Sequence, residues 1–72
     1  MTRYARLRTS VAVMIDAAGS ARRSAADWRR MAREWPKSDN EYKAAAARRI
    51  DDARWYLRRA RTDLDILAGD AA

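Results

Sequence analysis

The sequence predicts an all-α protein in which two long helices fold back on each other as an antiparallel hairpin. Apolar and small residues recur at alternating spacings of three and four residues through both halves of the chain, as in the heptads of a coiled coil. Only one short break, at residues 35–38, interrupts this pattern. Because two helices of nearly equal length joined by a short link lie antiparallel, we expect one coiled-coil-like hairpin domain spanning residues 1–72.

The first helix is expected over about residues 3–34. Its apolar pattern comprises Tyr4, Leu7, Val11, Met14, Ala18, Ala21, Ala25, Trp28, Ala32 and Trp35. Trp35 precedes Pro36, which disfavours the helical conformation at Trp35 and ends the helix. Gly19 allows an alternative, a three-helix bundle with a break at this glycine. The heptad phase crosses Gly19 without slipping, which favours a single helix.

The second helix is expected over about residues 39–68. Ser38 and Glu41 have the spacing of a capping box at its start, and Gly69 is placed to cap its end. Its pattern comprises Lys43, Ala46, Ile50, Ala53, Leu57, Ala60, Leu64 and Leu67.

Folding the chain about residue 37 sets residue i opposite roughly residue 74 − i, so that large side chains face small ones through the middle. This arrangement fills a layer without voids. It predicts a narrow waist where Ala21 meets Ala53. The residues of the seam, meaning those that face the other helix, are predicted to be Leu7, Val11, Met14, Ala18, Ala21, Ala25, Trp28, Ala46, Ile50, Ala53, Leu57, Ala60, Leu64 and Leu67.

The composition indicates that one hairpin alone buries too little apolar area for a substantial hydrophobic core. Of 35 hydrophobic residues, 17 are alanine, which buries little area. We therefore expect completion by a second copy into a four-helix bundle, or by a larger protein partner. Large apolar side chains outside the seam, together with a neighbouring arginine, are typical of binding hot spots. The partner-contact candidates are Trp55, Arg59, Ile66, Ile15 and Met31.

The net charge of +6 indicates an acidic partner such as nucleic acid or an acidic protein surface. Residues 1–35 carry eight arginines against three acidic residues. Candidates for contact with a phosphate backbone are Arg22, Arg23, Arg29, Arg30 and Arg33. Codon bias in a GC-rich genome also explains an excess of arginine and alanine together, and the sequence leaves this choice open.

The sequence offers no chemistry for catalysis. It contains no cysteine or histidine, and no Gly-rich loop that would hold phosphate. The adjacent Asp51 and Asp52 point about 100° apart on a helix and do not converge as an acid–base pair requires. We predict no enzyme activity and no catalytic, cofactor-binding or metal-binding residue. No small-molecule substrate is expected.

The longest apolar run near the N-terminus, Val11 to Ile15, is too short for a signal peptide or a membrane span. A cytoplasmic protein with no membrane partner is therefore expected. The leading hypothesis is a small non-enzymatic interaction or assembly protein, an oligomerising hairpin that binds or modulates a larger protein. The alternative is a basic nucleic-acid-associated protein that contacts phosphate through the arginines of its first helix.

Overall fold

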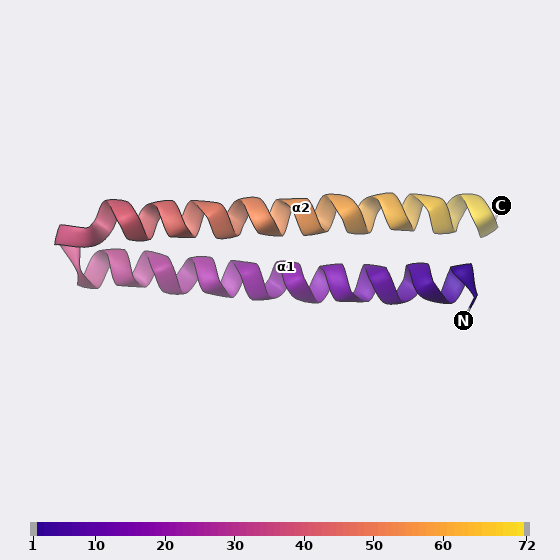
Figure 1. The fold of residues 1–72 in the computed structure, drawn as a ribbon, viewed down its shortest axis with the longest axis horizontal. Helices are drawn as coiled ribbons and strands as arrows, with labels where there is room; N and C mark the ends of the chain where they lie inside the picture. The colour runs from indigo at the N-terminus through magenta and orange to yellow at the C-terminus, as the bar shows by residue number, and fades with distance from the viewer. Residues whose placement is uncertain (1, 72) are drawn as a thin grey trace.

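The computed structural model describes residues 2–71 as two long helices joined by one short turn. Helix α1 spans Arg3–Glu34, the 3₁₀ turn η1 spans Pro36–Ser38, and helix α2 spans Asp39–Ala71. Figure 1 shows α1 and α2 side by side along their whole length, with the two chain ends at the same end of the molecule. The described residues contain no strand. The predicted all-α fold of two packed helices is confirmed.

Helix α1 runs without interruption through Gly19, so the three-helix alternative is wrong. Gly19 keeps a negative φ, and glycine inside a helix costs only about 1 kcal/mol. Ala18 and Ala21, on either side of it, are buried against α2, and this packing holds the helix together. At the start of α1 the Thr2 hydroxyl accepts a hydrogen bond from the Ala5 amide at 3.1 Å.

The turn is organised by Trp35, whose φ of −126° and ψ of 74° take it out of the helix as Pro36 predicts. Its amide donates to the Met31 carbonyl at 2.9 Å, and its carbonyl accepts from the Ser38 amide at 3.0 Å. The predicted capping box is wrong, because an N-cap residue must be non-helical and Ser38 lies inside the 3₁₀ turn.

Helix α2 continues to Ala71, three residues beyond its predicted end at residue 68. A capping glycine adopts a positive φ, but Gly69 does not, so it continues the helix and the predicted cap is wrong. In the register in which residue i faces 74 − i, residue 71 lies opposite Arg3. Helix α2 therefore extends about as far as α1 does.

The contact between the helices is made mainly by alanines spaced seven residues apart. Ala18, Ala25 and Ala32 are buried on α1, and Ala46, Ala53 and Ala60 are buried on α2. A methyl group lets two helix backbones approach closely, but it removes little apolar area from water. As a result, no large side chain among the described residues is fully buried.

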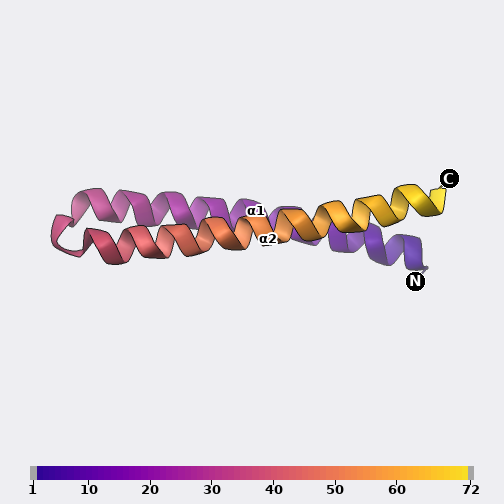
Figure 2. The same cartoon turned by 90° about the horizontal axis from the view of Figure 1, so that it is seen from above.

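The hairpin is a single layer, measuring 54 × 17 × 12 Å. Its radius of gyration is 16.3 Å, against about 11 Å for a compact domain of this length. Its accessible surface of 5587 Å² exceeds the roughly 4600 Å² expected for a compact monomer of this mass. In Figure 2, turned by 90° from Figure 1, the helices cross near their middles. Because the two helices form only one layer, both broad faces of the hairpin are open to solvent.

Candidate interaction faces

Most predicted seam residues lie between the helices, in two clusters. Val11, Ala60 and Leu67 form one cluster with Leu7 and Met14 packed against it. The other cluster comprises Ala18, Ala21 and Ala53, with Tyr56 and Leu57 against it. Ala25 and Ala46 are buried, while Trp28 and Ile50 are half-buried.

Leu64 was expected in the seam, and this prediction is wrong. Its side chain is 49% exposed, whereas the neighbouring Asp63 is only 2% exposed. The contact line of α2 is centred on Ala46, Ala53, Ala60 and Leu67, which are seven residues apart. Residues three or four away flank this line on one side or the other. At the open end α1 packs against the side occupied by Asp63, and Leu64 is left on the opposite side.

In the part of the chain that the structure describes, the buried Asp63 carboxylate has two partners. Ser10 Oγ donates a hydrogen bond to Asp63 Oδ2 at 2.8 Å, and Arg59 Nε lies 3.7 Å from Asp63 Oδ1. A buried carboxylate needs such partners to offset the loss of water. The sequence analysis did not identify this contact, because Asp63 and Leu64 are spaced alike from Ala60 and Leu67 and hydrophobicity favours Leu64.

One broad face, which we call the polar face, is marked by the bond between Ser10 and Asp63. A hollow of about 290 Å³ on this face is lined by residues of both helices, among them Ser24, Arg49 and Tyr56. Residues seven apart stay on the same side of a coiled-coil helix. The polar face comprises Ser10, Ala17, Ser24 and Met31 of α1, together with Tyr42, Ala45, Arg49, Asp52, Tyr56, Arg59, Asp63 and Ile66 of α2.

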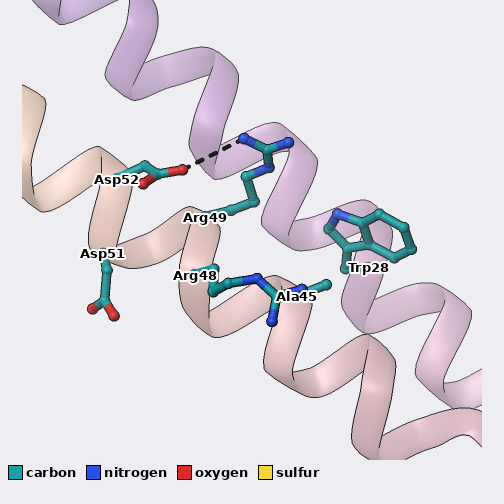
Figure 3. Close-up of a pocket in the computed structure, with 6 residues that line it drawn as sticks. All are labelled: Trp28, Ala45, Arg48, Arg49, Asp51 and Asp52. Carbon is teal, nitrogen blue, oxygen red and sulfur yellow. Dashed lines mark hydrogen bonds and ion pairs between the residues drawn. The ribbon is translucent and has the colours of Figure 1, made fainter.

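Nearer the turn, the Trp28 ring stacks on the Tyr42 ring, with centroids 5.7 Å apart and planes 22° apart. Beside this pair lies a hollow of about 360 Å³, whose lining residues are drawn in Figure 3. Arg49 Nη1 lies 3.4 Å from Asp52 Oδ2, and Asp51 points away from both (Figure 3). The two adjacent carboxylates therefore do not converge on one point. The described residues hold no group of potential metal ligands.

The opposite broad face, which we call the basic face, is marked by two hollows. One, near the turn, is lined by Arg29, Arg33 and Lys43 among others. The other is a groove of about 640 Å³ at the open end, lined by Tyr4, Arg8, Val11, Ala12, Ile15, Leu64, Leu67 and Ala68. On both helices, lining residues of one hollow are separated from lining residues of the other by multiples of seven residues, so the two hollows lie on the same face. The exposed basic side chains of this face are Arg8, Arg22, Arg29, Arg33, Lys43, Arg54 and Arg61.

The structure divides the five phosphate-contact candidates between two surfaces. All five are exposed. Arg22, Arg29 and Arg33 lie on the basic face, whereas Arg23 and Arg30 follow the outer edge of α1, away from α2. Arg30 is also paired with Asp27 at 3.2 Å. These arginines therefore do not form one continuous strip.

The five partner-contact candidates are likewise divided. Arg59, Ile66 and Met31 lie on the polar face, and Ile66 and Met31 are half-buried. Ile15 lies on the basic face and is 51% exposed. Trp55 is exposed on the outer edge of α2 beside the polar face, with its ring edge-to-face on Tyr56 at a centroid distance of 5.4 Å.

Comparison with family models, curated proteins and solved structures finds no significant match to this chain. Neither helix, over its described residues, contains a stretch long and apolar enough to cross a membrane.

Proposed function

We propose that the chain is a small non-enzymatic interaction protein that assembles as a homodimer of hairpins in a four-helix arrangement. The observation that carries this proposal is the single-layer fold, which leaves both broad faces in water. A face of 54 by 17 Å projects roughly 900 Å², close to the roughly 800 Å² that each partner contributes to a standard stable interface.

Between residues 10 and 66 the charges of the polar face balance, which makes it the better surface for a second copy. Arg49 and Arg59 oppose Asp52 and Asp63 on this face, so two copies facing each other do not accumulate like charge. Half-buried apolar side chains, including Tyr56, lie among these charges and would be covered by the second copy. Self-association through the basic face would bring many arginines together and is opposed by repulsion.

Sedimentation equilibrium on the purified chain, with two matched variants, tests this proposal. Ile66→Glu places a charge on the polar face, and Ile15→Glu places the same charge on the basic face. We expect Ile66→Glu to shift the equilibrium to monomer and Ile15→Glu to leave the dimer intact, with helicity checked by circular dichroism in both. An 8.3 kDa monomer for the unaltered chain at every concentration contradicts the proposal.

A second candidate function is binding to the phosphate backbone of nucleic acid. It is favoured by Arg22, Arg29 and Arg33, which are exposed on the basic face and have no carboxylate within 4.0 Å in the part of the chain the structure describes. Such binding falls steeply with salt. Replacing all three by glutamate is expected to abolish it, and no mobility shift of DNA or RNA at low salt contradicts it.

A further inference from the structure

We infer that the basic face is a docking groove for an acidic amphipathic helix of a partner protein. This inference rests on the proposed interaction role and specifies the chemistry of the partner that the basic face accepts. It concerns the face that the proposed homodimer leaves open, so one hairpin would use its two broad faces for two different partners.

The floor of the groove is apolar and shaped for a helix. Tyr4, Ile15 and Leu64 are each about half exposed, and with Val11 and Leu67 they line the groove of about 640 Å³. From Tyr4 to Ile15, helix α1 rises by roughly 16 Å, which is about three helical turns. Grooves with apolar floors of this length bind the apolar side of an amphipathic helix through residues spaced three and four apart.

The rims of the groove specify the charge of that helix. Arg8 and Arg22 flank Ile15 along α1, and Arg61 lies near Leu64 on α2. Among the described residues that line these two hollows, only Asp39 is acidic; it lies at the turn end, 3.1 Å from Lys43. Asp16 lines an adjoining hollow toward the outer edge of α1, on the far side of Arg8 and Ala12 from the groove floor. A helix with glutamates beside its apolar side chains would therefore find complementary charge on both rims. A second copy of this chain would not, because its basic face carries the same charges.

The apolar floor favours a protein helix over nucleic acid. A phosphate backbone would be attracted to the arginines but would leave Ile15 and Leu64 without an apolar contact. Bases stack on aromatic rings, and Tyr4 is the only aromatic side chain among the described residues that line this groove. An acidic amphipathic helix contacts the floor with its apolar side and the arginines of the rims with its glutamates. Burial of the exposed aliphatic side chains of the floor adds to its binding.

The test uses the full chain and labelled peptides of about 20 residues, long enough to form a helix. One peptide has leucines at the seam positions of a heptad and glutamates beside them, and its matched control has lysines in place of the glutamates. Fluorescence anisotropy gives the dissociation constant of each. We expect the acidic peptide to bind at least about tenfold more tightly than the basic one, with a difference that shrinks as salt is added.

Two variants of the chain then locate the site. Ile15→Glu places a charge on the groove floor, while Val13→Glu places it on an equally exposed aliphatic position, roughly 160° away around the same helix. The exposed fractions of the two side chains are 51% and 55%. Ile15→Glu is expected to weaken binding of the acidic peptide at least about tenfold, as for a hot-spot contact, and Val13→Glu to change it little.

Three results overturn the inference. The first is equal binding of both peptides, or of neither; the second is an equal effect of Ile15→Glu and Val13→Glu. The third is that duplex DNA or an anionic lipid vesicle binds more tightly than the acidic peptide and is unaffected by Ile15→Glu, which assigns the face to phosphate. Sedimentation of the same samples reports the homodimer separately, so loss of peptide binding with an intact dimer contradicts this inference alone.

Discussion

Replacing Ala25 by leucine tests whether alanine methyl groups set the spacing of the two helices. Ala25 is only 1% exposed and lies in the seven-residue series of alanines through which α1 contacts α2. Leucine adds three carbon atoms that have no free space at this contact. Either the side chain adopts a strained rotamer or the helices move apart and lose contacts at neighbouring alanines.

The expected decrease in the free energy of unfolding is large relative to the total stability of so small a chain. Overpacking a closely packed core costs about 1–3 kcal/mol. Chains of this length are stabilised by about 4–11 kcal/mol, and the alanine-rich core places this protein toward the lower value. A loss of about 2 kcal/mol therefore removes up to half of the stability. For domains of this size it lowers the melting temperature by roughly 8–16 °C.

Thermal unfolding followed by circular dichroism, at one fixed protein concentration, measures this loss. The matched control is Ala26→Leu, which places the same side chain at the next residue, where it is exposed. Surface substitutions of this kind change stability by about 0.5 kcal/mol or less. If both variants melt at the same temperature, or if Ala25→Leu is the more stable, the helices are not held at the alanine spacing and the packing argument is wrong.

Three further substitutions test individual features. Gly19→Ala is expected to raise the free energy of unfolding by about 1 kcal/mol, since the added Cβ meets only the end of the flexible Arg23 side chain at 3.4 Å; a lower melting temperature would contradict this. Ser10→Ala removes the hydrogen bond to the buried Asp63 and is expected to cost about 1–3 kcal/mol in urea unfolding, and no change would show that the bond is not formed. Trp55→Ala should keep the helical circular dichroism signal while weakening self-association in sedimentation, and a loss of helicity would show that the exposed ring supports the fold.

The sequence predicted where the helices and the turn lie better than it predicted which side of each helix faces the other helix. Heptad spacing and Trp35 before Pro36 were enough for the two helices and the turn, because both signals act through local backbone geometry. The choice between Asp63 and Leu64 was not predictable from hydrophobicity. The two are adjacent in sequence and flank Ala60 and Leu67 on opposite sides, so packing against α1 decides which is buried.

The candidate surfaces were predicted only in part for the same reason. A list of exposed arginines and large apolar side chains follows from the heptad pattern, but the face to which each belongs depends on which side of α2 meets α1. Arg30 illustrates this, because it was grouped with Arg22 although it lies on the outer edge and pairs with Asp27. The apolar groove at the open end was not anticipated, since the exposure of Leu64 creates part of it.

The hydrogen bond between Ser10 and Asp63 also bears on how the helices find their alignment. Alanines repeated every seven residues look much the same after one helix slides by a heptad, so they discriminate poorly between aligned and shifted pairings. A buried carboxylate does discriminate, because a slide would separate it from the one hydroxyl that meets it. If the chain were cut within its turn, the bond between Ser10 and Asp63 would still favour re-association of the two halves in the original alignment.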